Sequence, residues 1–333
     1  MTPVSILVGL MPVLLFLATL IFMDSYKLVT LQGVLRTIFV GCVAAFAALH
    51  LNQWLLHAGV GEAHLKRFVA PMIEEALKAL FIVHLIRTAR VGFMVDAGIH
   101  GFALGAGFAL VENVYYSHEL QDPRIAVWVV RGFGTAVLHG SCTAMFAIVS
   151  KGLADRRGSA SLLWFLPGAL LAAGVHSLFN QFLLSPFVET AVILILMPLA
   201  VVLVFERSER ATRRWLGTGF DTDVELLELI LSGEIRHSRV GSYLESLKAR
   251  FPGRVVADML CYLRIHLELS LRAKGILIAR ASGLRVPIDD QVRANFEELR
   301  FLERSVGKTG KIAILPILRT SSRDLWQIHM LGK

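Results

Sequence analysis

The sequence predicts an all-α protein, a polytopic transmembrane helix bundle of about seven spans followed by a soluble helical C-terminal domain. Hydrophobic residues make up 55% of the 333 positions, and the mean hydropathy is +0.62, as in polytopic membrane proteins. Residues 1–205 contain 12 Lys/Arg and 10 Asp/Glu, whereas the shorter segment 206–333 contains 22 and 16. We therefore divide the chain into a transmembrane domain, 1–205, and a water-soluble domain, 206–333.

Seven apolar segments have roughly the length that a hydrocarbon core requires, about 20 residues each. They lie near residues 4–23, 33–56, 65–86, 97–117, 125–150, 161–184 and 187–205. No Lys or Arg precedes Lys27, so the first segment lacks the positive start of a cleaved signal peptide. We interpret this segment as a retained membrane anchor.

The third segment, 65–86, differs from the others because it is amphipathic. It contains five charged residues: Lys66, Arg67, Glu74, Glu75 and Lys78. Such a segment either spans the membrane half-buried in the bundle or is re-entrant, which would change the number of spans.

Basic clusters predict the orientation of the bundle, because Lys and Arg accumulate in cytoplasmic loops. With seven spans, three clusters fall on one side: Arg87 and Arg90; Lys151, Arg156 and Arg157; and Arg207, Arg210, Arg213 and Arg214. This places the C-terminal domain in the cytoplasm. Lys66 and Arg67 fall on the opposite side, against the rule.

Small residues recur every four positions in two segments. They are Gly101, Gly105 and Ala109 in the fourth segment, and Gly132, Ala136, Gly140 and Ala144 in the fifth. Small residues at this spacing let helix backbones approach closely in lipid. We expect a tightly packed bundle.

The tail, 206–333, has the pattern of soluble amphipathic helices, expected near 222–232, 240–250, 253–280 and 288–306. Its surplus of six positive charges is interspersed with acids, which favours a membrane-proximal surface over a nucleic-acid-binding one. The three cysteines, Cys42, Cys142 and Cys261, are far apart and predict no disulfide framework or thiolate zinc site.

Polar residues interrupt the apolar segments at four places, where each ionisable group costs at least about 2.5–3.5 kcal/mol to insert. In the third segment, Glu74 and Lys78 are four residues apart and predict an internal ion pair. Glu75 points about 100° away from Glu74, which leaves it free for chemistry. The alternative is a salt-bridged surface of an interfacial helix.

The remaining three places lie in the fourth, fifth and sixth segments. Glu112 and Asn113 lie in a helix that is otherwise apolar, so Glu112 either binds a cation or is a neutral acid in a helix–helix hydrogen bond. His139 alone fits a core histidine. His176 and Asn180 are four residues apart and suit a metal ligand with its neighbour, or an oxyanion-stabilising pair. Arg131 either faces these residues or snorkels to the nearer interface.

Four motifs in this order resemble the PrsW family of intramembrane proteases. They are Glu74-Glu75-x-x-Lys78, Phe108-x-x-x-Glu112-Asn113, His139, and His176-x-x-x-Asn180, in successive apolar segments of roughly 60–185. The family is distantly related to the CAAX prenyl proteases and other CPBP membrane proteases. The resemblance does not extend to residues 206–333, where a regulatory partner or ligand can be accommodated.

The resemblance implies hydrolysis of a peptide bond within the bilayer, by an enzyme of the bacterial cytoplasmic membrane. PrsW proteins act on a single-pass anti-sigma factor, so a single-pass membrane protein is the implied substrate. The family is described as metalloproteases, whereas its CAAX relatives resemble glutamate-dependent enzymes.

Both chemistries can be built from these residues. In the metal version, Glu112, His139 and His176 bind Zn²⁺ and Glu75 is the general base. In the glutamate version, Glu75 activates water directly, and His176 and Asn180 stabilise the oxyanion. The CPBP motif FxxxH reads Phe108-x-x-x-Glu112 here, so the activating histidine of those relatives is missing, although His139 could substitute.

Two other functional classes use similar residues. A proton- or cation-coupled transporter also needs membrane carboxylates and histidines, but the sequence shows no internal repeat. A catalytically inactive scaffold for single-pass partners would not need acids and histidines in all four motifs. We therefore predict an intramembrane protease with Glu75 activating water.

Overall fold

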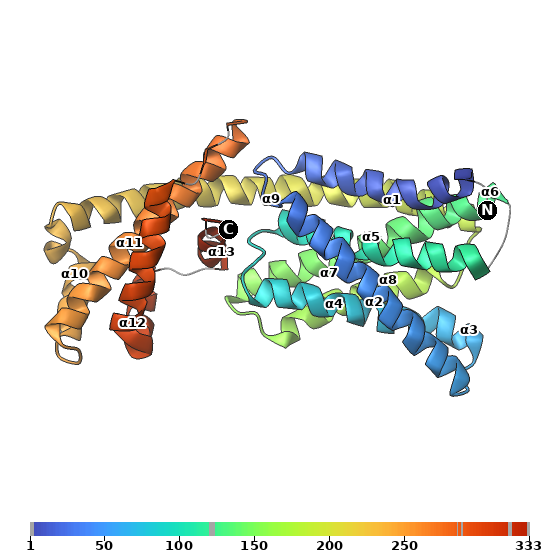
Figure 1. Cartoon of the computed structure of the whole chain (residues 1–333), viewed down its shortest axis with the longest axis horizontal. Coiled ribbons are helices and arrows are strands. Elements are labelled where there is room, and N and C mark those ends of the chain that lie inside the picture. The colour runs from blue at the N-terminus through green and yellow to red at the C-terminus, as the bar shows by residue number, and fades with distance from the viewer. Residues whose placement is uncertain (1–2, 120–123, 285, 288, 319–321, 332–333) are drawn as a thin grey trace. The chain divides into compact units, whose positions relative to one another are not determined.

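The computed structural model describes residues 3–119, 124–284, 286–287, 289–318 and 322–331, and every regular element in them is a helix (Figure 1). The all-α prediction is therefore confirmed. The chain forms two compact units, Met1–Glu209 and Arg210–Lys333.

Helices of the first unit, together with α9, which continues into the second unit, coincide with all seven expected apolar segments. In chain order they are α1 (Pro3–Met23), α2 (Leu31–His57), α3 (Glu62–His64), the π-helix η1 (Leu65–Val69), α4 (Ala70–Arg87), α5 (Met94–Glu119), α6 (Ile125–Val129), the π-helix η2 (Val130–Thr135), α7 (Ala136–Arg157), the 3-10 helix η3 (Leu162–Phe165), α8 (Leu166–Phe179) and α9 (Pro186–Leu231).

Five stretches are long and apolar enough to cross a membrane: Leu31–His57, Met94–Glu119, Ile125–Arg157, Leu162–Phe179 and Pro186–Leu231. The described part of α1 adds a shorter apolar helix, Leu7–Met23. Helix α4 is not among these spans, because its acids and Lys78 lower its hydropathy.

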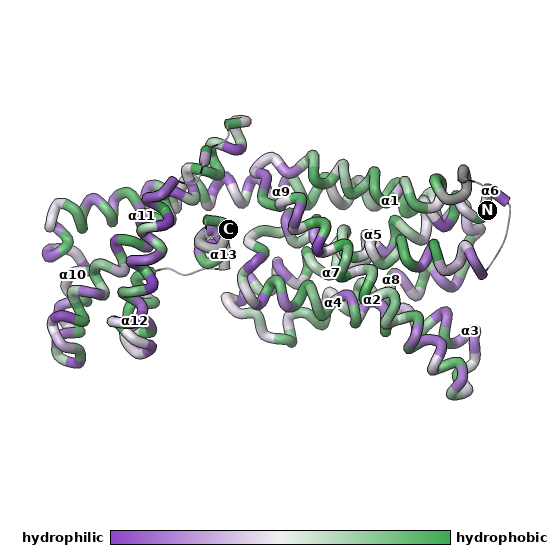
Figure 2. The backbone as a smooth tube through the Cα atoms, viewed as in Figure 1, coloured by the Kyte–Doolittle hydropathy of each residue, from purple (hydrophilic) through white to green (hydrophobic). Residues whose placement is uncertain are grey.

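Apolar side chains on the outside of the bundle fit a lipid environment. Along α2, Leu31, Leu35, Phe39 and Phe46 are each more than half exposed, and Ile195 on α9 is 67% exposed. Figure 2 shows hydrophobic residues along α1 and along the part of α9 beside it. In water this surface would be unfavourable, whereas lipid tails solvate it.

Glycines bring the backbones of α5 and α7 into contact. A Cβ atom on Gly105 would lie 2.2 Å from the His139 carbonyl oxygen, and one on Gly101 would lie 2.6 Å from that of Thr143. A Cβ on Gly132 would lie 2.0 Å from the Val8 carbonyl oxygen of α1. The prediction of close helix packing is thus confirmed, and these contacts place His139 deep in the bundle.

Helix α9 corrects one expectation about the boundary between membrane and tail. A break was expected near residue 206, with a new helix at 222–232, but Pro186–Leu231 is one helix of 46 residues. The change at Glu206 is a change of polarity, and charged residues such as Glu and Arg have high helix propensity. Polarity alone does not end a helix.

The second unit is a helical domain with its own apolar core. After the 3-10 helix η4 (Glu234–His237) come α10 (Arg239–Leu247), α11 (Gly253–Ala281), α12 (Asp290–Leu318) and α13 (Ser322–Leu331). Helix α12 is interrupted at Gly307, whose φ of 69° and ψ of 175° are not helical. Three of the expected tail helices correspond to α10, α11 and the first part of α12, whereas α13 was not expected.

The core of this unit lies around α11, where Met259, Ile265 and Leu269 are buried. Beside it, Lys274 is 2% exposed and forms an ion pair of 2.7 Å with Asp223 of α9. Ser270 Oγ also donates to Asp223, at 2.5 Å.

Candidate active site

Helix α4 presents two neighbouring carboxylates with different partners. Lys78 is fully buried, and its Nζ lies 2.5 Å from Glu75 Oε1. The expected pair between Glu74 and Lys78 is therefore wrong. Both spacings put an acid within reach of a lysine on a helix, so the tertiary surroundings decide between them.

Glu75 is held by three contacts. Besides Lys78, it accepts a hydrogen bond from His176 Nδ1 at 3.0 Å, and Thr143 Oγ1 lies 3.5 Å from its second oxygen. The residue is 4% exposed. Glu75 is thus held in place and shielded from water.

Glu74 has the opposite surroundings. Asn52 donates to its Oε1 at 3.2 Å, and His176 Nε2 lies 3.8 Å from its Oε2. Among the described residues no Lys or Arg forms an ion pair with Glu74. It is the acid of this pair that faces the cavity.

His139 on α7 is engaged at both ring nitrogens. Lys78 Nζ lies 3.1 Å from Nδ1, and Glu112 Oε2 lies 2.6 Å from Nε2. Because an ammonium group only donates, Nδ1 accepts and Nε2 carries the proton that it donates to Glu112. The surroundings therefore select one tautomer of His139.

His176 at the end of α8 meets His139 edge to face. The ring centroids are 4.7 Å apart, and the planes are inclined by 87°. Since Nδ1 of His176 donates to Glu75, its Nε2 points to the side of Glu74, and in the neutral ring this nitrogen carries the lone pair.

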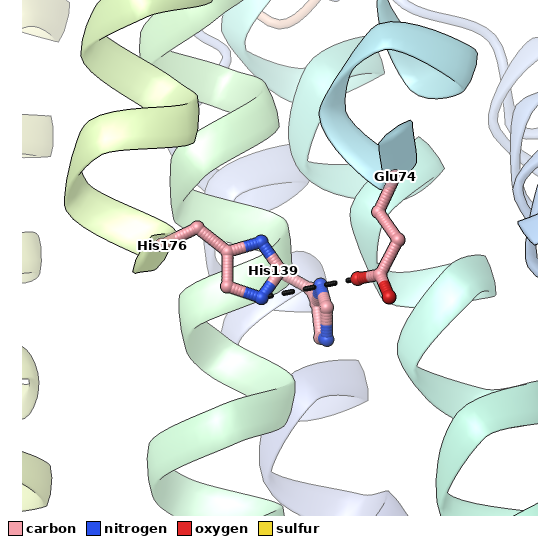
Figure 3. Close-up of side chains that lie close together, drawn as sticks. All are labelled: Glu74, His139 and His176. Atoms are coloured by element: carbon pink, nitrogen blue, oxygen red, sulfur yellow. Dashed lines mark ion pairs between the residues drawn. The ribbon is translucent and has the colours of Figure 1, made fainter. Parts of the chain in front are cut away.

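One ligand atom from each of Glu74, His139 and His176 lies within 4.8 Å of the others (Figure 3). This group differs from the expected metal set in one member, because Glu74 stands in place of Glu112. The Glu112 carboxylate instead accepts from His139 and lies 3.5 Å from Arg131.

Asn113 and Asn180 contact backbone near the site. Asn113 Nδ2 donates to the Gly9 carbonyl of α1 at 2.8 Å, and its Oδ1 accepts from Arg131 at 3.0 Å. Asn180 Nδ2 donates to the Lys66 carbonyl of η1 at 3.0 Å. These bonds give both amides a structural role.

A cavity of about 970 Å³ opens beside the cluster. It is bounded by α2, η1, α4, α5, η2 and α8, and its polar lining includes Asn52, Lys66, Arg67, Glu74, Glu112, Tyr116, Arg131, His176 and Asn180. Glu75, Lys78 and His139 lie behind this lining. This volume is at the upper end of the range typical of ligand pockets.

Two residues were not assigned to the site from the sequence. Arg131 contacts Glu112 and Asn113, and Phe108 lies under Lys78, whose Nζ is 4.4 Å from the ring centroid. A charge in an apolar segment was the signal for Arg131, but its direction depends on the π-helical turn η2. Phe108 was expected only as part of a motif.

The cluster contains more acid than base. Glu74, Glu75 and Glu112 provide three negative charges, and Lys78 and Arg131 provide two positive ones. With both imidazoles neutral, one negative charge is left over in a largely buried place. Such a surplus favours a bound cation or a proton.

Comparison with known proteins bears on the first unit. The sequence profile of one family, described as PrsW family intramembrane metalloprotease, matches residues 28–205, which is more than half of the chain. No curated protein and no solved structure matches the chain.

Proposed function

The chain belongs to the PrsW family of intramembrane metalloproteases and is an integral membrane endopeptidase, and we propose that it cleaves a single-pass membrane protein, resembling an anti-sigma factor, at the cavity beside Glu74. The observation that carries this proposal is the convergence of Glu74, His139 and His176, of which Glu74 and His176 line that cavity and His139 lies behind them. The substrate class rests on the family resemblance.

The three side chains fit a zinc ion in their chemistry. Two imidazoles and one carboxylate are a known ligand set of catalytic zinc, which keeps a further position open. His176 donates to the Glu75 carboxylate, as zinc-binding histidines commonly do. The surplus negative charge of the cluster would be neutralised. When bound, zinc supplies a Lewis acid and lowers the pKa of its water to about 7.

The proposal assigns the remaining acids by their exposure to the cavity. Glu112 lines the cavity, so we assign it the role of general base. Its carboxylate accepts a proton from the attacking water and then, as general acid, donates this proton to the leaving amine. Glu75 was expected in this role, but Lys78 and His176 surround it, which supports an orienting role instead.

A metal-independent mechanism is favoured by one observation, the engagement of both nitrogens of His139. To bind a metal, His139 must give up its bond to Lys78 or to Glu112. Without a metal, Glu74 would take the proton from a water held between its carboxylate and His176 Nε2.

Cleavage of a single-pass substrate in liposomes tests these assignments. We expect Glu74→Gln and His176→Ala to abolish cleavage, and His84→Ala, an exposed histidine of α4, to cleave like wild type. Loss of cleavage on chelation with recovery on added Zn²⁺ selects the metal mechanism, and indifference to chelator selects the glutamate one. Full cleavage by both site variants would sink the proposal, and ion flux without cleavage would indicate a transporter.

For the tail, we propose that residues 206–333 form a cytoplasmic domain at the bacterial cytoplasmic membrane that receives a regulatory partner or ligand. The basic clusters that flank the spans support this side. Cys261 is exposed on α11, whereas Cys142 is buried and Cys42 half-buried. A membrane-impermeant maleimide should label Cys261 only after the cells are permeabilised, and Cys261→Ser should remove the label. Labelling of intact cells would overturn the orientation.

A further inference from the structure

Arg131 is a largely buried cation whose contacts all lead to one turn of a neighbouring helix. It lies in η2, and its side chain is 13% exposed. Its Nε donates to Asn113 Oδ1 at 3.0 Å, and its Nη2 lies 3.5 Å from Glu112 Oε1. The guanidinium carbon lies 4.0 Å from the centroid of the Tyr116 ring.

This arrangement excludes snorkelling. A snorkelling arginine extends along apolar surface towards water. Arg131 instead donates from Nε to Asn113, its Nη2 lies at ion-pair distance from Glu112 without a hydrogen bond, and its guanidinium face lies on Tyr116. A planar group with several donors is suited to holding two acceptors at once. The consequence is that one Glu112 oxygen lies beside a largely buried cation.

The orientation of Glu112 determines that of His139. With one Glu112 oxygen near Arg131, the other accepts the proton of His139 Nε2 at 2.6 Å. A histidine is commonly oriented by a carboxylate on its second nitrogen, and loss of such a partner typically costs about 10- to 100-fold in activity or affinity.

We propose that Arg131 is a positioning residue for peptide-bond hydrolysis: it fixes Glu112, and through Glu112 it fixes the ring of His139. This inference rests on the proposed function of the Glu74, His139 and His176 cluster. It applies directly to the metal mechanism, in which His139 is a ligand, and to the glutamate mechanism only through the edge-to-face contact of His139 with His176.

Helix α1 takes part in the same arrangement, although it lies outside residues 28–205, which match the family. Asn113, the second acceptor of Arg131, donates to the Gly9 carbonyl of α1 at 2.8 Å. Gly132 follows Arg131 and lies so close to Val8 that no Cβ would fit. The proposal therefore includes α1, which accepts the hydrogen bond of Asn113 and packs against Gly132 next to Arg131.

Kinetics of two variants test the positioning role. We expect Arg131→Gln to lower kcat by about 10- to 100-fold with a much smaller change in KM, because His139 is released while Arg131 is only one of the polar side chains that line the cavity. Arg131→Lys should recover part of the loss, since lysine keeps the charge without the planar fork. Arg36→Gln, on the exposed face of α2, is the matched control and should behave like wild type.

A double-mutant cycle decides whether Arg131 acts through Glu112. Because Glu112 is also assigned the proton of the attacking water, the comparison is made on the residual rate of Glu112→Gln in single turnovers. If Arg131 acts through Glu112, adding Arg131→Gln lowers that residual rate no further. Independent, multiplicative losses would overturn the inference. So would a wild-type rate for Arg131→Gln or, if that variant does not fold, a wild-type kcat for Arg131→Lys.

The two proposals fail in different ways. If Glu74→Gln abolishes cleavage while Arg131→Gln leaves kcat unchanged, the cluster stands and the role of Arg131 is wrong. If Glu74→Gln cleaves like wild type, the proposed function is wrong whatever Arg131 does.

Discussion

His176 donates to Glu75 through Nδ1 at 3.0 Å, and this single bond directs its Nε2 towards Glu74, 3.8 Å away. Two adjacent acids of one helix therefore lie on opposite sides of one imidazole. Glu75 lies behind the ring with Lys78, and Glu74 lies in front of it at the cavity. The different roles of the two acids follow from this geometry.

Substitutions of the two acids should separate catalysis from stability. Glu75→Gln leaves Lys78 buried without its counter-ion, and we expect a loss of about 3–5 kcal/mol in the free energy of unfolding. Glu74→Gln breaks no ion pair with a lysine or arginine of the described residues, so we expect abolished cleavage with little loss of stability. Unfolding in detergent, measured beside cleavage, checks both.

A second substitution tests the cause of the Glu75 effect. Combined with Lys78→Met, Glu75→Gln should regain much of the lost stability, because no charge remains unpaired. Equal destabilisation by Glu74→Gln and Glu75→Gln would contradict the pairing of Lys78 with Glu75.

Glycine-mediated packing predicts a sharp contrast between two Gly→Ala variants. A Cβ at Gly105 would meet the His139 carbonyl at 2.2 Å, so Gly105→Ala should lower stability by about 1–3 kcal/mol and displace His139. Gly174 of α8 has open space around its Cβ position, so Gly174→Ala should be neutral or stabilise by up to about 1 kcal/mol. Melting temperatures in one detergent compare them, and a similar effect of both would refute the packing.

The ion pair between Lys274 and Asp223 predicts a cost specific to the C-terminal unit. Lys274→Met leaves Asp223, still 18% exposed, without its cation. We expect a loss at the lower end of about 3–5 kcal/mol. Lys248 pairs with Glu245 at 2.6 Å on the surface, where Lys248→Met should cost at most about 1 kcal/mol. Pulse proteolysis of the full-length protein in urea measures the stability of both variants. Equally small losses of stability would show that the pair of Lys274 and Asp223 does not stabilise the C-terminal unit.

His266 predicts how the stability of the same unit depends on pH. Burial lowers the pKa of His266 below the ordinary 6.5, and the positive charge of Lys274 lowers it further. The negative charges of Asp324 and Asp223 oppose this shift but do not cancel it. In the unfolded chain His266 takes up a proton near its ordinary pKa of about 6.5, whereas in the folded unit it does so only at lower pH. Acidification from about pH 7.5 to 5 therefore favours the unfolded chain, and the free energy of unfolding falls. The slope is at most about 1.4 kcal/mol per pH unit.

Hydrogen exchange of α11 amides in the full-length protein, followed across this pH range, checks the His266 effect. His266→Gln should flatten the dependence, whereas His237→Gln, exposed in η4, should not. An unchanged dependence in His266→Gln would assign the acid sensitivity to other groups.

The fold was predictable to the extent that it depends on local patterns. Each of the seven apolar segments is helical because its composition admits no other structure in lipid. The close approach of α5 and α7 was visible in the spacing of Gly101 and Gly105, since that spacing keeps small residues on one face. Local patterns did not show where α9 ends, because its helix propensity continues when its hydropathy falls.

The sequence by itself determined that acids, histidines and a lysine are buried together in a membrane helix bundle, because their cost in lipid is too high for scattered placement. Only the tertiary structure decided which of them are partners. Lys78 reaches either Glu74 or Glu75 by helical spacing, and the position of His176, 101 residues away from Glu75, selects Glu75. Arg131 likewise takes its direction from α5 and α1. Which side chains pair inside the bundle depends on contacts between segments that are distant in the sequence. The spacing of residues within one helix carries no information about these contacts.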